Sequence, residues 1–399
     1  MTRTRSRAPF ALVTAAYQAF TLSDGALRML VLLHLHAQGN TASALALVLL
    51  PYEAAGVFTN LLGGWLGGRF GLKVTLLAGL LLQTLACGLL AVDAAWLTVP
   101  YVMATQVLSG IAKDLAKTAA KSYVKQLAPT ADGHRLFGLV AFVTGSKNAV
   151  KGLGFFAGGA LLAWCGFQAT NLALGGILLA MALLAARMLP PLPGRPQTAW
   201  RDVLQQGPAL RWLALARAFL FGSRDVWFAV ALPVFLSSVL QWPAGTVGGV
   251  LAAWVIGYGL VQALVPRWLP ATSLRQGARH AAAASLLAAL PLAAARSGGI
   301  TTGPTVLVLL GVYGVFFAAA SSLHSWLVVA LAGDEKTAER VGFYYAANSL
   351  GRLTGTLASG ALYVRAANGA DGLAATMLAA TFAAIVAALC TLPVRIDAA

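Results

Sequence analysis

Residues 63 to 73 read GGWLGGRFGLK, a glycine-rich and basic stretch between two long apolar runs. The runs on either side, 42–66 and 74–92, are each long enough to cross a bilayer as a helix, which takes about 20 mostly apolar residues. Arg69 and Lys73 together with the glycines predict a short loop at one membrane surface. The stretch therefore predicts a membrane hairpin, and the rest of the chain can be placed around it.

The composition extends this prediction to the whole chain. Of the 399 residues, 59% are hydrophobic, only 10% are charged and 42 are glycine. This balance is typical of a multi-span membrane protein and not of a soluble domain. Three cysteines lie in apolar runs without paired spacing, so we expect packed thiols, no metal and no cofactor.

Hydropathy predicts twelve membrane-spanning helices in an all-α protein. Their expected ranges are 10–35, 42–66, 74–92, 97–121, 136–162, 169–189, 212–239, 246–266, 277–295, 304–331, 341–364 and 372–393. The proline-rich LPPLPGRPQTAW separates two groups of six. We therefore expect an N-terminal half at 1–190, a cytoplasmic linker at 191–211 and a C-terminal half at 212–399.

The distribution of basic residues predicts the orientation. Of 28 Lys and Arg, 17 fall at the termini and in the even-numbered loops, whereas only Arg296 and Arg365 fall on the opposite side. By the positive-inside rule, both termini are predicted to be cytoplasmic in a multi-pass protein of the inner (plasma) membrane. The +16 net charge is explained by this bias, so it does not indicate a nucleic-acid partner.

The two halves also resemble each other. HRLFGLVAFVTGSK at 134–147 and ERVGFYYAANSLGR at 339–352 each place a basic loop residue twelve positions before a basic residue inside a span. Internal repeats of this kind are typical of secondary transporters. Lys147 and Arg352 are therefore expected to be equivalent, in two pseudo-symmetric halves.

The opening loop resembles the signature of the major facilitator superfamily, Gly-x-Leu-x-Asp-Arg-x-Gly-Arg-Lys. The matching residues, which we expect to form a gating loop, are Gly64, Leu66, Arg69, Gly71 and Lys73. The sequence departs at Gly68, where the family usually has Asp, and at Leu72, where it usually has Arg. Gly68 thus lacks the carboxylate of the charge latch that this loop commonly makes with neighbouring helices.

Charged residues inside the predicted spans carry the functional signal. Nine are basic: Arg28, Lys113, Lys117, Lys121, Lys147, Lys151, Arg217, Arg224 and Arg352. Four are acidic and are the candidate coupling groups or counter-ions: Asp24, Glu53, Asp114 and Asp225.

Some of these charges have structural explanations. Helical spacing places Asp114 nearer in angle to Lys121 than to Lys117, so we expect an Asp114–Lys121 pair. Asp24 and Arg28 are four residues apart and could pair within one helix. Lys121 and Arg217 lie close enough to helix ends to extend to the membrane surface.

Four acids cannot neutralise nine bases, and each unpaired cation inside hydrocarbon costs roughly 2.5–3.5 kcal/mol or more. A cavity that receives an anion resolves this imbalance. The expected substrate-binding residues are Arg28, Lys113, Lys117, Lys147, Lys151, Arg224 and Arg352, with Tyr17, Tyr345 and His324. Arg28 and Arg224 are predicted to face each other and to grip a phosphate-like group bidentately.

Three further stretches resemble the ArsJ-type organoarsenical efflux permeases: FTLSDGALRMLVLLHLH, SGIAKDLAKTAAKSYVK and TGSKNAVKGLGFF. The resemblance implies export of 1-arseno-3-phosphoglycerate by alternating access, and hence arsenate resistance. It also implies a functional partnership with glyceraldehyde-3-phosphate dehydrogenase, which makes that compound from arsenate. Proton antiport is compatible with the sequence but is not required, because the membrane potential already drives an anion outward.

Alternative functions remain open at this point. An organic-phosphate/inorganic-phosphate exchanger, or another organic-anion exporter, would use the same basic residues. A cation or drug exporter is disfavoured by the basic spans, and a membrane sensor by the lack of a signalling domain. An enzyme is disfavoured because no nucleophile–base pair is evident. We expect a monomer in the lipid bilayer.

Overall fold

The computed structural model describes residues 7–37, 42–127, 133–195, 197–297, 303–332, 336–366 and 369–394. These residues are almost entirely helical and contain no β-strand. The elements are α1 (Arg7–Ala37), α2 (Ala42–Phe70), α3 (Leu72–Leu90), η1 (Ala94–Trp96), α4 (Val99–Leu127), α5 (Gly133–Met188), α6 (Trp200–Leu204), α7 (Pro208–Phe228), α8 (Ala231–Val234), η2 (Phe235–Val239), α9 (Ala244–Trp268), α10 (Leu274–Ser297), α11 (Gly303–Leu331), α12 (Thr337–Arg365) and α13 (Gly369–Thr391).

The twelve predicted spans are present, and the seventh differs in detail. The fifth and sixth spans are two helices within α5, which meet at Gly166, where the backbone is not helical and φ is 76°. The predicted seventh span ends as α7 at Phe228 and continues as the short α8 and the π-helical η2. At this break the backbone N–H groups of Val230 and Ala231 donate to Ser359 Oγ of α12, at 3.3 and 3.1 Å. The break is therefore satisfied by a side chain, as backbone inside a membrane requires.

Six of the described helical segments are apolar and long enough to cross a membrane. They include the long α5, α9, α11 and α13. Three helices that carry intramembrane bases, α1, α4 and α12, are not among the six. This difference follows from their charged and polar residues, which is the feature that makes them candidates for a site.

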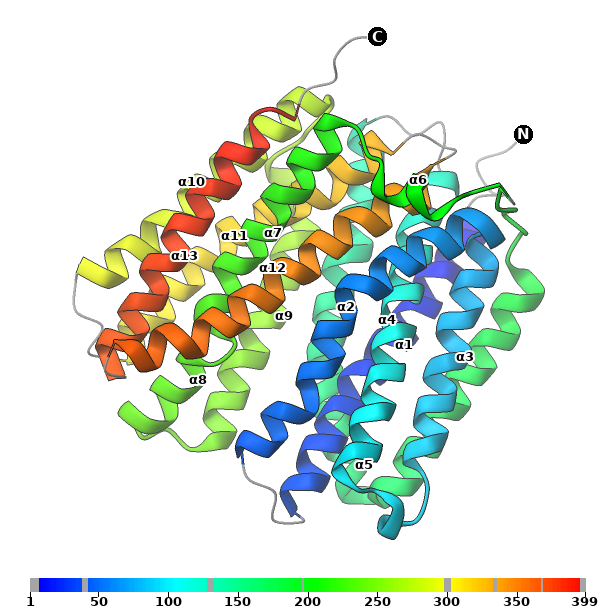
Figure 1. Ribbon diagram of the computed structural model, residues 1–399, viewed down its shortest axis with the longest axis horizontal. Helices are drawn as coiled ribbons and strands as arrows, with labels where there is room; N and C mark the ends of the chain where they lie inside the picture. Colours follow the sequence, from blue (N-terminus) through cyan, green and yellow to red (C-terminus); the bar gives the residue numbers. More distant parts are fainter. Residues whose placement is uncertain are drawn as a thin grey trace. The chain divides into compact units, whose positions relative to one another are not determined.

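The chain forms two compact units. The described residues within Met1–Thr130, Ser146–Gln205 and Ala332–Ala346 make up unit 1, and those within Ala131–Gly145, Gln206–Leu331 and Ala347–Ala399 make up unit 2. In unit 1, α4 packs against α2, α3 and α1. In unit 2, α10 packs against α11 and α13, and α13 packs on α7 (Figure 1). The first turns of α12 thus belong to unit 1, although most of that helix belongs to unit 2.

Candidate functional site

The lysine stripe of α4 is tied to a buried carboxylate. Asp114 is completely buried, and its Oδ1 accepts from Lys117 Nζ at 2.6 Å. Its other oxygen, Oδ2, accepts from Thr59 Oγ1 of α2 at 2.5 Å. The sequence offered no signal for Thr59, because a lone threonine in an apolar run is usually structural.

The expected Asp114–Lys121 pair is wrong. Lys121 Nζ instead donates to the hydroxyl of Tyr345 on α12. Seven residues of α-helix rise about 10 Å, whereas three rise about 4.5 Å, so Asp114 reaches Lys117 much more easily. The angle around the helix favoured Lys121, but the distance along the helix decides the pairing.

Tyr345 connects the two lysines. Lys117 Nζ lies 4.8 Å from the centre of the Tyr345 ring, and Lys121 Nζ lies 4.7 Å from it. A tyrosine ring stabilises such cations most strongly where water is excluded, and Tyr345 is only 3% exposed. Lys113, one turn earlier on α4, is half-buried. The stripe is therefore a group of ammonium ions packed on one carboxylate and one aromatic ring.

A second acid–base pair in unit 1 connects α1 and α5. Lys151 Nζ lies 2.7 Å from Asp24 Oδ2. The two helices are close at this point, since a Cβ on Gly25 would lie only 2.6 Å from the Lys151 carbonyl oxygen. Arg28, the partner that helical spacing predicts for Asp24, lies one turn further along α1.

Unit 2 contains a corresponding pair between α7 and α12. Asp225 Oδ2 accepts from Arg352 Nε at 3.0 Å, and Asp225 Oδ1 lies 2.5 Å from Arg224 Nη2. A Cβ on Gly355 would lie 2.9 Å from the Gly222 carbonyl oxygen, so these helices are also close. One carboxylate serves two guanidinium groups, which leaves the group with a positive charge.

The two halves therefore share an arrangement of acid, base and glycine. In unit 1, Asp24 pairs with Lys151, three residues before Gly154, where a Cβ would lie 2.5 Å from the Leu22 carbonyl oxygen of α1. In unit 2, Asp225 pairs with Arg352, three residues before Gly355. By this criterion Lys151 is the equivalent of Arg352, and the predicted equivalence with Lys147 is wrong. Sequence alignment could not decide this, because both lysines lie on α5 four residues apart.

Aromatic rings surround the guanidinium group of Arg224. Its Cζ lies 4.8 Å from the centre of Phe221, 5.7 Å from that of Phe317 and 5.9 Å from that of Phe228. These phenylalanines were not predicted from the sequence. Phe221 and Phe228 lie three residues before and four after Arg224, a spacing that places all three on one helix face.

Arg217 has a different environment. It is 3% exposed, and it donates to Asn348 Oδ1 at 2.9 Å and to Ser321 Oγ at 3.0 Å. The interpretation that Arg217 and Lys121 extend to the membrane surface is therefore wrong, because both are held inside their units by buried partners. Arg217 connects α7, α11 and α12 in unit 2.

The remaining candidates occupy varied positions. Tyr17 is buried on α1, and Lys147 is half-buried on α5. His324 is completely buried and its Nε2 lies 3.0 Å from Thr391 Oγ1 of α13, so this contact holds α11 on α13 and does not favour a role in substrate binding. Glu53 belongs to α2, but its side chain lies outside the described part of the chain.

Residues 10–269, more than half of the chain, match the family model of the Major Facilitator Superfamily. The chain belongs to this superfamily. Two uncharacterised MFS-type transporters of Mycobacterium tuberculosis, from strains CDC 1551 and H37Rv, are each 30% identical to it over 322 residues. The similarity covers 75% of this chain and 72% of each relative. The protein is thus a secondary transporter of the major facilitator type.

Solved structures confirm the predicted fold. The structure of the human organic anion transporter MFSD10 has a TM-score of 0.74 at 17% identity and covers 99% of this chain and 100% of its own. The transporter FucP in an outward conformation has a TM-score of 0.76 at 14% identity, with 97% of this chain and 98% of its own covered. At these identities the similarity shows the major facilitator fold and not the substrate.

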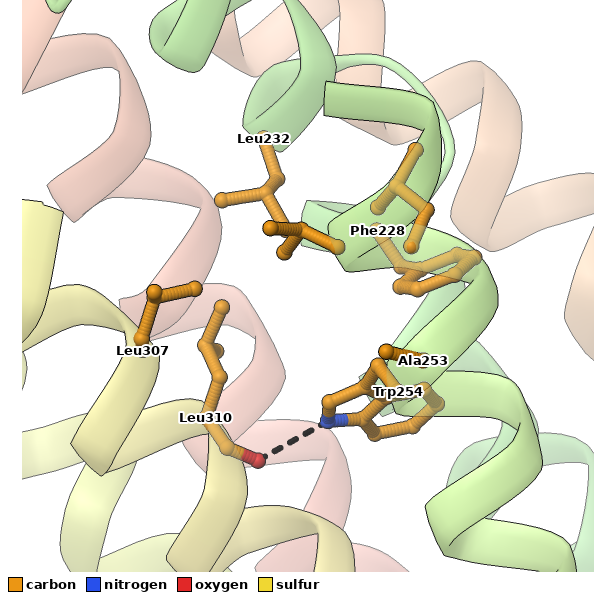
Figure 2. Close-up of a pocket in the computed structure, with 8 residues that line it drawn as sticks. Phe228, Leu232, Ala253, Trp254, Leu307 and Leu310 are labelled. Atoms are coloured by element: carbon orange, nitrogen blue, oxygen red, sulfur yellow. Dashed lines mark hydrogen bonds between the residues drawn. The ribbon is translucent and has the colours of Figure 1, made fainter. Parts of the chain in front are cut away.

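One pocket in unit 2 is apolar. It has a volume of about 220 Å³ and lies between the end of α7, α8, α9 and α11. Its lining residues are Phe228, Leu232, Val250, Leu251, Ala253, Trp254, Leu307 and Leu310. Figure 2 shows Trp254 at its edge, donating from Nε1 to the Leu310 carbonyl oxygen at 3.0 Å. None of these eight lining residues is charged.

Proposed function

We propose that this transporter exports a small, multiply charged organic anion, and that the substrate is 1-arseno-3-phosphoglycerate. The observation that carries the proposal is the excess of positive charge inside both units. In unit 1, six intramembrane bases accompany the described acids Asp24 and Asp114. In unit 2, three arginines accompany Asp225. A bound anion offsets this charge, and a cationic substrate would add to it.

The exposure of the paired residues supports an anion site. The side chains of Asp24 and Asp225 are each 4% exposed, whereas those of Lys151 and Arg352 are 19% and 31% exposed. Each carboxylate therefore holds its base from the buried side, and each base keeps an accessible side. Such support fixes the direction of the remaining N–H groups before a ligand arrives.

We propose different roles for the acids and the bases. In unit 2, Arg352 makes the first contact with the anion, and Arg224 with its rigid guanidinium fork binds a phosphate or arsenate group; in unit 1, Lys151 has the role that Arg352 has in unit 2. Asp24, Asp114 and Asp225 act as counter-ions while the site is empty. The facing of Arg28 and Arg224 is a relation between the two units and stays a prediction.

The identity of the anion rests on the ArsJ-type stretches, together with the match between a substrate that has two anionic groups and the two groups of bases. The proposal includes partnership with glyceraldehyde-3-phosphate dehydrogenase, location in the plasma membrane and cytoplasmic termini. The membrane potential contributes about 2.3 kcal/mol per exported charge at 100 mV.

Co-expression with that dehydrogenase in an arsenate-sensitive host tests the substrate. We expect lower cell arsenic and higher resistance to arsenate, with no change in resistance to arsenite. A variant with Arg352→Gln should lose the protection, whereas Arg267→Gln, a change of an exposed base in the last turn of α9, should retain it. Equal protection against arsenite would contradict the proposed substrate, because arsenite does not replace phosphate.

Transport in vesicles distinguishes the phosphate exchanger. An exchanger requires inorganic phosphate on the opposite side of the membrane, whereas the proposed exporter does not. Transport of the organic anion that stops when the opposite side lacks phosphate would favour the exchanger.

A further inference from the structure

In the GGWLGGRFGLK segment, the space beside Gly68 is filled by a side chain of α12. A Cβ on Gly68 would lie 2.6 Å from Oε1 and 2.7 Å from Cδ of Glu339. Glu339 lies in the first turn of α12, is completely buried and belongs with Gly68 to unit 1. Only a glycine at position 68 leaves room for this carboxylate.

The central linker holds the same carboxylate from its other side. The Arg195 guanidinium forms an ion pair with Glu339 Oε1. The backbone N–H of Arg195 donates to the Gly68 carbonyl oxygen at 2.7 Å, and Thr198 Oγ1 donates to the same oxygen at 3.3 Å. The carbonyl oxygen of Gly68 thus binds the linker, and the Glu339 carboxylate occupies the space that a side chain at position 68 would fill.

Neighbouring contacts fix the linker and the start of α12 in this place. Lys73 Nζ donates to the Leu189 carbonyl oxygen at 2.8 Å, and Trp65 Nε1 donates to the Thr198 carbonyl oxygen at 3.3 Å. A Cβ on Gly342 would lie 2.6 Å from Gly64 Cα, so α12 and α2 touch through glycines. The ion pair is therefore the charged element of an otherwise apolar helix contact.

The buried position of Glu339 costs free energy. Its second oxygen, Oε2, is buried without a hydrogen-bond partner in the described structure. Burying such an atom costs about 1–3 kcal/mol or more, a loss that exposure to water would relieve. The ion pair at Oε1 therefore stabilises the contact, and the unsatisfied Oε2 lowers the free energy needed to open it.

We propose that Glu339 supplies, from α12, the carboxylate that the last turn of α2 lacks at Gly68, and that Arg195, Glu339 and Gly68 form a linker latch. The latch holds the central linker and the first turns of α12 on α2. The contact lies within unit 1, but α12 continues into unit 2 after Ala346, so any movement of α12 with unit 2 pulls on the latch. Glu339 is thus a positioning residue that sets how readily the transporter leaves this conformation.

Moving the carboxylate from position 339 to position 68 tests the latch. Gly68→Asp alone places two carboxylates together, and Glu339→Ala alone removes the carboxylate that Arg195 contacts, so both variants should open the latch. Gly68→Asp combined with Glu339→Ala should restore it, because the aspartate at position 68 then faces Arg195. Gly68→Asn with Glu339→Ala is the matched control, since it has the same shape without the charge.

Limited trypsin cleavage of the purified protein in detergent reports the state of the latch, because Arg201 on α6 is exposed within the linker. We expect cleavage to be roughly tenfold faster in Glu339→Gln and in both single variants, since each breaks a buried ion pair or crowds it. The Gly68→Asp/Glu339→Ala double variant should return to within about twofold of the wild type. This readout is independent of the transported substrate.

Two results would overturn the proposal. One is a Gly68→Asp/Glu339→Ala protein that is no more resistant to trypsin, or no better folded, than the asparagine control. The other is unchanged cleavage and transport in Glu339→Gln. Either would mean that Glu339 only fills space beside Gly68.

Discussion

Replacing Asp114 by Asn isolates the role of the buried lysine stripe. The change removes the only carboxylate that Lys117 contacts in the described structure, at 2.6 Å, while the Tyr345 ring remains 4.8 Å away. Breaking a buried ion pair from one side costs about 3–5 kcal/mol. For a domain of about 200 residues, this corresponds to a fall in melting temperature of roughly 10 °C.

Adding Lys117→Gln should reverse most of that loss, because no uncompensated cation remains. The Asp114→Asn/Lys117→Gln protein should therefore melt within a few degrees of the wild type, by our estimate within about 3 °C. It should still fail to export, since Lys117 is one of the bases that we propose for the anion site.

Melting temperature in detergent and uptake by everted vesicles are to be measured on the same preparations. Thr59→Val is the matched control, because it removes only the 2.5 Å hydrogen bond to Asp114 and should cost about 1.5–3 kcal/mol. Recovery of both stability and export in the double variant would refute the reasoning, since Lys117 would then be a structural partner of Asp114 alone.

Three further predictions follow from individual contacts. Arg224→Lys keeps the charge but loses the guanidinium fork, so export should fall at least tenfold with unchanged membrane expression, measured by vesicle uptake and immunoblot. Ser359→Ala leaves two backbone N–H groups at the α7 break without an acceptor and should lower stability by about 1–3 kcal/mol in a thermal melt. His324→Gln should retain export, because the His324–Thr391 contact lies between α11 and α13; a transport defect in a stable His324→Gln protein would return His324 to the substrate group.

Much of the fold could be predicted from the sequence because each span is a local property. Twenty apolar residues, a glycine or proline and a basic cluster define each helix without knowledge of its neighbours. The break after Phe228 had a local signal in Pro233, which removes the hydrogen bond to the Ala229 carbonyl. Its acceptor Ser359 could not be predicted, because that residue is remote in the sequence.

The charged residues could be predicted as a set but not as pairs. A helical wheel ignores the rise along the axis, so it favoured Lys121 over Lys117 as the partner of Asp114. It also says nothing about other helices, and so it could not choose Lys151 as the partner of Asp24. The space beside Gly68 was invisible for the same reason, because Glu339 is remote in the sequence.

The central claim is that the basic residues of the two units bind the organic polyanion that the protein exports. The most direct measurement is the arsenic content of everted vesicles supplied with glyceraldehyde-3-phosphate, NAD, arsenate and the dehydrogenase, which together generate 1-arseno-3-phosphoglycerate outside. We predict that vesicles with the wild-type protein accumulate arsenic only when all four components are present, and that Lys151→Gln and Arg352→Gln abolish the accumulation. Equal accumulation from arsenate alone, or undiminished accumulation in both variants, would contradict the account.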